Sequence, residues 1–453
     1  MYSIIVLIIL SFLCFALNLD VERGLSTASH IVLYCCHVGV LVSSAVLIFY
    51  YFRSIRDYFI KLRYYRLFLI SYTASLYFLH TIWSPYLLIG NSGWGFDPQR
   101  YYYYASEMIK YGGTIDYSLN GWGVVYFYKY PMQLLGLDPM IPLFINSLLT
   151  LYAILVVSHF FFKNNTKYLH YFSLILLLPE MIYYNFMSSR EIPCMVFMTI
   201  CLCKAISGYQ YKSKKDIIIS FIAFVFLYII RPTMALPIVM GIIIYLGFNA
   251  KNKFPAFIGV IAILAITYFV NAASEDLDIA KSSTDVVSAT QDRLDVEGQE
   301  ENENYNYSSN SISRLLIPHN TFEFVIYGFI RPFGYIFITP ATIKRPFKIL
   351  SLKGHQGQCG GFSAWTTLFM FLLIPFMYKT LKRYKSYGRN MKIVICVFAS
   401  FFVVVGMFNT TLIHPRYRLV YDLLYFSLAF YGIVNRKILS DKNNSKNVPA
   451  DIG

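Results

Sequence analysis

The sequence predicts an all-α polytopic membrane protein, on the basis of its composition, the length of its apolar runs and the placement of its basic residues. Of the 453 residues, 57% are hydrophobic and only 14% are charged, and the mean hydropathy is +0.51. These values lie far outside the range of ordinary soluble domains. We therefore expect residues 1–453 to form a single integral membrane domain, and we exclude an ordinary soluble enzyme.

Apolar runs long enough to cross a bilayer occur at about twelve places, since a crossing helix needs about 20 residues. They fall near residues 2–18, 29–52, 67–89, 137–162, 168–186, 191–207, 217–231, 233–249, 254–272, 363–378, 392–410 and 419–435. The first run lacks the basic n-region and the cleavage site of a signal peptide, so it is expected to remain as a span. Most of the eight cysteines fall inside these runs, which argues against a disulfide framework or a zinc knuckle.

The basic residues set the orientation. The net charge is +15, but the Lys and Arg residues stand in short clusters between apolar runs, as orientation signals do, so we expect no nucleic-acid partner. Basic segments such as KAISGYQYKSKK and KTLKRYKSYGRNMK are expected in the cytoplasm. An even number of spans then places both termini in the cytoplasm.

Two large regions are expected on the outer face. The first, 90–130, is rich in Tyr and Gly, and the second, 272–362, begins with a strongly acidic stretch that is expected to be mobile. Within the second, 321–340 is apolar but carries Arg331-Pro332 at its centre. We expect this segment to be re-entrant or interfacial, because a crossing there would move the following basic loop outside.

Ionisable residues that could carry chemistry gather toward the predicted outer face. Cations there could hold a lipid-linked phosphate, and a carboxylate could take a proton from an attacking hydroxyl. The candidates are Asp97, Arg100, Arg190, Glu191, Arg231, Arg331, His414, Arg416 and Arg418.

Simpler interpretations exist for each candidate. An Arg at a helix end often only anchors the helix at the interface, and Asp97, followed by Pro98, is typical of a helix N-terminus. Glu180 and Asp422 fall in or near spans, where a charge costs free energy unless it is paired. They indicate a polar interior or a cavity, with either a structural or a functional role.

Several familiar motifs are missing from the sequence. It contains no Walker A motif, no GxSxG and no HExxH. We expect no nucleotide or redox cofactor, and no metal, because no paired DxD motif stands beside the candidate residues. The energy for a reaction would then have to come from the bound substrate.

The chain resembles a known family in several segments. GFDPQRYYYYASEMIKYG, MSSREIPCMVFMTICLCKAI, YIIRPTMALPI, FIRPFGY and HPRYRLVYDLLYFSLAFYGI follow one another in this order. This pattern resembles the bacterial O-antigen and capsular polysaccharide polymerases (Wzy-like), allied to the multi-spanning GT-C type glycosyltransferases. The resemblance covers roughly residues 90–435.

The resemblance implies a GT-C-like enzyme of the bacterial inner membrane that acts on the periplasmic face. It implies transfer of glycan from an undecaprenyl-phosphate or undecaprenyl-diphosphate carrier to an acceptor hydroxyl, with other polysaccharide assembly proteins as possible partners. Carried onto this sequence, Asp97 would be the base, and Arg190, Arg231, Arg331 and Arg416 would bind the carrier phosphates.

Three other functions stay open. A GT-C glycosyltransferase with a polyprenyl-phosphate sugar donor would share most features, although its acidic loop often follows the first span, whereas Asp97 follows the third predicted one. A lipid-linked oligosaccharide flippase should carry its cations along a central cavity and often shows internal repeats, which this sequence lacks. A scaffold within an envelope-assembly complex would not require the Asp97 and arginine set.

Overall fold

The structure, a computed structural model, is almost entirely helical in the part of the chain that it describes. It describes residues 97–113, 123–137, 140–162, 171–172, 174–185, 188–249, 355–408 and 416–444, with isolated helical positions at 42, 46, 62–63, 66–67, 70, 323, 326 and 330. The α-helices are α5 (Asp97–Tyr111), α6 (Gly123–Leu135), α7 (Met140–Phe162), α9 (Pro179–Asn185), α10 (Glu191–Tyr211), α11 (Lys214–Ile230), α12 (Pro232–Asn249), α18 (His355–Lys382), α19 (Arg389–Phe408) and α20 (Arg416–Asn444). Two short 3-10 helices, η3 (Leu174–Leu177) and η5 (Tyr384–Ser386), complete the set. The all-α prediction is confirmed for these residues.

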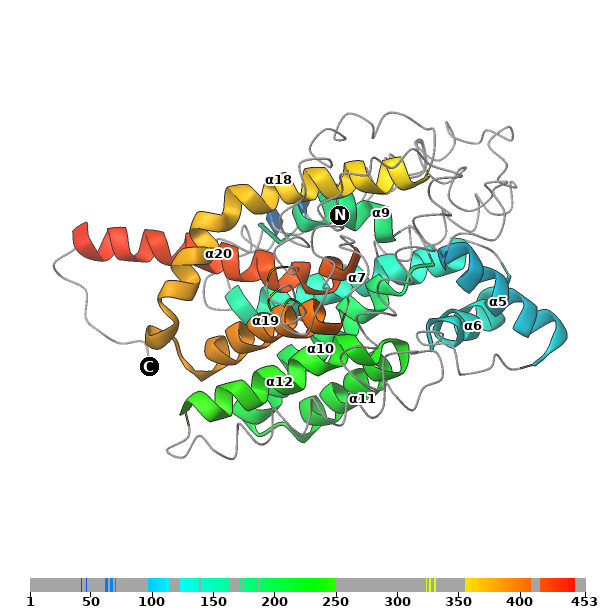
Figure 1. The fold of residues 1–453 in the computed structure, drawn as a ribbon, viewed down its shortest axis with the longest axis horizontal. Helices are drawn as coiled ribbons and strands as arrows, with labels where there is room; N and C mark the ends of the chain where they lie inside the picture. The colour runs from blue at the N-terminus through cyan, green and yellow to red at the C-terminus, as the bar shows by residue number, and fades with distance from the viewer. Residues whose placement is uncertain are drawn as a thin grey trace.

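Helix α10 lies at the centre of the bundle. It packs against α7, α9, α11, α12 and α20, and most of its side chains are buried, as expected for a helix that is apolar on all sides. Figure 1 shows α10, α11, α12, α18, α19 and α20 running along the long axis of the molecule. Because successive helices are joined by short turns, α10 to α12 alternate in direction, and so do α18 and α19.

Close backbone contacts hold two further helix pairs together. A Cβ atom added to Gly241 of α12 would lie 2.3 Å from Cα of Val397 in α19, and one added to Gly432 of α20 would lie 2.3 Å from the carbonyl oxygen of Phe376 in α18. Glycine at such positions lets helices approach more closely than any other residue allows. The α12–α19 and α18–α20 contacts therefore depend on these two glycines.

Two described helices are long and apolar enough to cross a membrane by length and composition, Ile145–Phe162 in α7 and Glu191–Tyr211 in α10. The apolar stretch Met234–Gly247 in α12 is shorter. Apolar runs predicted near 137–162, 191–207, 217–231, 233–249, 363–378, 392–410 and 419–435 all coincide with helices.

The run predicted near 168–186 differs from a single helix. The chain forms η3, leaves helical geometry at Leu178 and re-enters it at Pro179, where α9 begins. Proline lacks a backbone N–H and fits the first turn of a helix rather than its interior. The break places Glu180 at the start of a new helix instead of in the middle of a span.

The two regions predicted on the outer face are described only in part. The segment 90–130, predicted as a loop, contains α5 and the first half of α6. The predicted spans at 2–18 and 254–272 and the acidic stretch 272–310 lie outside the described residues, and the runs at 29–52 and 67–89 and the segment 321–340 lie outside them except at isolated helical positions.

Candidate functional site

The turn between α11 and α12 brings Arg231 into the bundle. Arg231 is extended, with φ −159° and ψ 96°, and the helical region is disfavoured for a residue that precedes proline. Helix α11 therefore ends at Ile230, and Pro232 starts α12. The Arg231 N–H donates to the Leu227 carbonyl at 2.8 Å, and the side chain is only 10% exposed.

Arg190 and Glu191 meet Arg231 at this end of the bundle. Oε1 of Glu191 lies 3.6 Å from Nε of Arg190 and 3.8 Å from Nη1 of Arg231. The Glu191 side chain is 5% exposed and that of Arg190 is 15% exposed. Glu191 also stands in the first turn of α10, where the helix dipole favours a negative charge. Two guanidinium groups thus face one carboxylate, and the three charges sum to +1.

This arrangement can hold an anion. The separations are those of ion pairs and are longer than hydrogen bonds, so Glu191 does not clamp either guanidinium group rigidly. A guanidinium group presents a planar fork of donors that matches phosphate or carboxylate oxygens. Because the surroundings are mostly excluded from water, the net positive charge acts on an anion more strongly than it would at an open surface.

Tyr128 fixes the segment that precedes Arg190. Its hydroxyl donates to the Ser189 carbonyl at 2.6 Å and contacts Oδ1 of Asn146 at 3.0 Å. Burial, with a further contribution from nearby Glu191, raises the pKa of Tyr128 well above its usual range, while the Asn146 contact lowers it. Tyr128 therefore stays a neutral donor and ties α6 and α7 to the start of α10.

Helix α5 adjoins this region through α6. It begins at Asp97, as the Asp-Pro pattern predicts, and the two helices pack together. Tyr101, one turn after Asp97, is buried and is an electrostatic neighbour of Tyr128. Arg100, in contrast, has an exposed side chain. Asp97 thus lies one helical turn before Tyr101. Tyr101 in turn neighbours Tyr128, which fixes the segment before Arg190.

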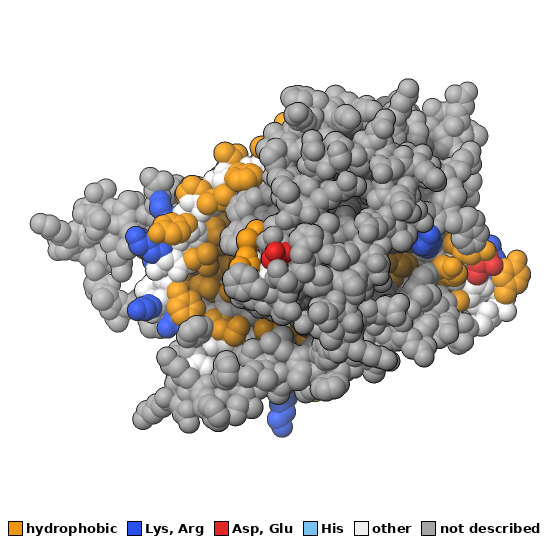
Figure 2. All heavy atoms as spheres, in the orientation of Figure 1, with side chains coloured by type: hydrophobic (Ala, Val, Ile, Leu, Met, Phe, Trp, Pro, Cys, Tyr) orange, Lys and Arg blue, Asp and Glu red, His pale blue; other side chains and the backbone are white. Residues whose placement is uncertain are grey.

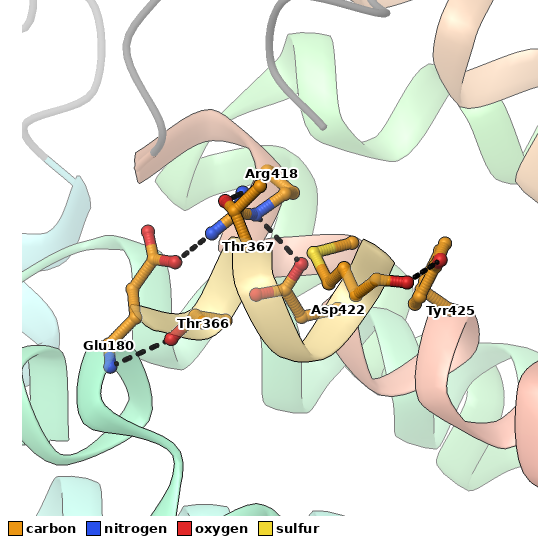
Figure 3. Close-up of polar contacts among 7 residues, drawn as sticks. Glu180, Thr366, Thr367, Arg418, Asp422 and Tyr425 are labelled. Atoms are coloured by element: carbon orange, nitrogen blue, oxygen red, sulfur yellow. Dashed lines mark hydrogen bonds and ion pairs between the residues drawn. The ribbon is translucent and has the colours of Figure 1, made fainter. Parts of the chain in front are cut away.

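A second charged cluster lies deeper in the bundle (Figure 3). Arg418 of α20 donates from Nη2 to Glu180 of α9 and from Nη1 to Oγ1 of Thr367 in α18 at 2.7 Å. Its Nε lies 3.3 Å from Oδ1 of Asp422. The backbone N–H of Glu180 donates to Oγ1 of Thr366 at 3.1 Å. The three charged side chains are at most 2% exposed, so the cluster is closed to water.

The partners of Arg418 define its role. Its Nη1 and Nη2 donate hydrogen bonds to Thr367 and Glu180, and its Nε forms an ion pair with Asp422, so the partners come from α9, α18 and α20. The geometry therefore favours a structural role for Arg418, which was expected to bind phosphate. The pairing that Glu180 and Asp422 required as buried charges is present.

The remaining candidates are placed in part. Arg416 is the first residue of α20, but its side chain, like that of Asp97, lies outside the described set. Arg331 and His414 lie outside the described residues altogether. Among the residues that the structure describes, no group of three His, Cys, Asp or Glu could hold a metal ion.

Two residues of the site were not anticipated from the sequence. Tyr128 lies in the segment 90–130, which is predicted as a loop although the sequence of α6 has an amphipathic pattern. Asn146 stands in an apolar run, where an amide is costly unless it is paired, and that signal could have identified it.

No protein-family model matches the chain, and no curated protein or solved structure matches it. The function has therefore to be argued from the two charged clusters and from the helices that surround them.

Proposed function

We propose that the chain is a multi-pass protein of the bacterial inner membrane, with about twelve spans and both termini in the cytoplasm. Support comes from the distribution of side chains across the bundle. Phe221 of α11 is 66% exposed and Leu372 of α18 is 71% exposed, whereas Glu180, Arg418 and Asp422 are buried. A soluble protein places charges outside and large apolar side chains inside, so this reversed arrangement fits a lipid environment.

The Arg190, Glu191 and Arg231 cluster is proposed to lie on the periplasmic side. It stands where α10 begins and where α11 ends, at one end of both helices. The other ends of these helices carry exposed lysines, such as Lys212 and Lys214. Under the positive-inside rule these lysines face the cytoplasm.

The proposed activity is polymerisation of undecaprenyl-linked oligosaccharide repeat units into surface polysaccharide. The observation that carries it is the pair of guanidinium groups that converge on a single buried carboxylate. In this proposal Arg190 and Arg231 bind the phosphate groups of the carrier, and Glu191 offsets part of the repulsion between the two arginines. The resemblance of the surrounding segments to polysaccharide polymerases adds to this argument.

The proposed step is one glycosyl transfer. The acceptor hydroxyl oxygen forms a bond to the anomeric carbon of the donor glycan, the bond from that carbon to the carrier phosphate oxygen breaks, and the hydroxyl proton passes to Asp97. The transition state is oxocarbenium-like, and Arg190 and Arg231 stabilise the charge that develops on the departing phosphate. Arg100, Arg331, His414 and Arg416 are proposed as further substrate contacts.

Two alternatives use the same phosphate chemistry. A GT-C transferase with a polyprenyl-phosphate sugar donor differs only in the carrier and in the number of sugars moved. A flippase needs cations inside the bundle, and Arg418 has that placement. However, Arg418 is enclosed by two carboxylates, and this favours an enzyme with its cations at the bundle end.

The proposal is tested in a strain that lacks the gene, complemented with wild type, Arg190→Ala, Arg231→Ala or the exposed control Arg63→Ala. Surface polysaccharide is profiled by gel, and membrane levels of each variant are measured. We expect each site variant to lose the long-chain ladder while a single repeat unit remains, because loss of one charge-stabilising donor lowers turnover about 100-fold or more.

Other outcomes would decide against the polymerase. Loss of even the single repeat unit would indicate a transferase or flippase that acts earlier. A full ladder with Arg190→Ala and Arg231→Ala, at normal membrane levels, would show that these arginines are only interfacial anchors.

A further inference from the structure

The end of the bundle opposite the Arg190, Glu191 and Arg231 cluster carries a basic surface. Lys and Arg side chains gather at the left end in Figure 2, where no acidic side chain is visible among the described residues. We call this surface the basic rim. Its members are Lys212, Lys214, Lys215, Lys379, Lys382, Arg383, Lys385, Arg389 and Lys392.

Direct contacts make the basic rim one continuous surface. Nη1 of Arg389 donates to the Tyr209 hydroxyl at 3.0 Å, and Nδ2 of Asn390 donates to Oε1 of Gln210 at 2.7 Å. The Arg389 guanidinium carbon also lies 5.3 Å from the centre of the Tyr209 ring. These contacts join the end of α10 to the start of α19, although 180 residues separate them.

The charge of the basic rim is largely uncompensated. The segment from Pro375 to Lys392 contains no acidic residue. On the α10–α11 side, Asp216 is engaged with Lys204, which lies outside the rim, at 3.0 Å. The rim therefore presents a net positive charge to whatever faces it.

Apolar surface borders the basic rim on two helices. On α18, exposed Leu372 and Tyr378 are followed by Lys379 and then by exposed Lys382. On α11, exposed Lys214 and Lys215 are followed by exposed apolar side chains that begin at Ile217, which is 50% exposed. The change from apolar to basic thus occurs at the same end of both helices, as it would at the boundary between acyl chains and headgroups.

We propose that the basic rim binds the headgroups of anionic phospholipids in the cytoplasmic leaflet. The inference rests on the membrane placement proposed above. Clusters of Lys and Arg next to spans attract anionic lipids, and exposed tyrosines such as Tyr209 and Tyr378 fit the interfacial layer. The adjoining apolar surface selects a lipid over a nucleic acid or an acidic protein, because only a lipid supplies both an anionic headgroup and an acyl chain.

The test uses the purified full-length protein in a mild non-ionic detergent. It is titrated with phosphatidylglycerol or with phosphatidylcholine of the same acyl chains, and bound lipid is counted by native mass spectrometry at two salt concentrations. The variant pair Lys382→Gln and Lys385→Gln removes two rim charges. The matched pair Lys110→Gln and Lys129→Gln removes two charges from α5 and α6, away from the rim.

We expect wild type and the Lys110/Lys129 variant to prefer phosphatidylglycerol, and we expect this preference to weaken as salt rises. One Lys near an anionic headgroup contributes roughly fivefold in affinity. The Lys382/Lys385 variant should therefore lose about tenfold or more of its affinity for phosphatidylglycerol, with phosphatidylcholine binding unchanged.

Two results would overturn the inference. Equal retention of both lipids by wild type would remove the anionic-lipid role and leave the membrane placement intact. A protein that retains neither lipid and stays monodisperse after detergent removal would overturn the membrane placement as well.

Discussion

Removal of Arg418 is the sharpest test of the buried cluster. In Arg418→Met, Glu180 and Asp422 remain as two carboxylates in a site where neither is more than 1% exposed. Breaking a buried ion pair by deleting one partner costs roughly 3–5 kcal/mol, because the remaining charge stays uncompensated. We expect a loss of that size in the free energy of unfolding, and a larger loss where both carboxylates remain charged.

The same reasoning predicts recovery when all three charges are removed together. In the triple variant Glu180→Met, Arg418→Met and Asp422→Leu no buried charge is left, and apolar replacement of buried ion pairs is often neutral. We expect its stability to return to within roughly 2 kcal/mol of wild type. The exposed control Arg63→Met should change stability by less than about 0.5 kcal/mol.

The assay is reversible unfolding of the purified protein in mixed micelles, followed by circular dichroism as the fraction of denaturing detergent rises. A loss below about 1 kcal/mol for Arg418→Met would refute the description of a closed cluster in which Arg418 compensates two buried carboxylates. So would a triple variant that is no more stable than the single variant, since its loss would then arise from packing alone.

Three further predictions concern packing, positioning and topology. Gly241→Ala places a methyl group against the α19 backbone and should lose about 1–3 kcal/mol of stability in the same assay. The control Gly388→Ala, whose methyl group meets open space, should lose little. Equal losses in the two variants would refute the close contact. Tyr128→Phe removes a hydroxyl that contacts two buried acceptors, so it should lower stability by about 1–3 kcal/mol and shorten the polysaccharide ladder. The control Tyr130→Phe, at an exposed position, should do neither. Normal ladders in both variants would show that Tyr128 does not support the site. A reporter fused after Lys385 should be active only in the cytoplasm, and activity only outside would contradict the orientation.

Local signals in the sequence were sufficient for most of the described helices. Proline and lysine residues at their ends mark the beginnings and ends of α10, α11 and α12, and the apolar runs supply the lengths. The sequence does not predict the break at Pro179, because the residues around it are apolar enough to extend a hydropathic run through it. Within 90–130 the sequence predicts only the start of α5, at Asp97-Pro98, and α6 is not predicted because the polarity of the segment argues against a span.

The charged clusters show the limit of such reasoning. Arg190 and Glu191 are adjacent, and Arg231 stands at the next helix end on the same side, so helix direction alone predicts that they lie near one another. The sequence indicates that Glu180 needs a charged partner, but it does not indicate which residue that partner is. Arg418 lies 238 residues away, and only the packing of α9, α18 and α20 brings the two side chains together.

Lengthening of a lipid-linked glycan in isolated membranes tests the central proposal most directly. Lipid-linked oligosaccharide extracted from the deletion strain is added to membranes that contain wild type, Arg231→Ala or no copy of the chain, and the products are resolved by size. Wild type should convert the single repeat unit into a series of longer lipid-linked chains, and the other two membranes should leave it unchanged. Equal lengthening in all three, or none in wild-type membranes that contain the protein at normal levels, would contradict the polymerase.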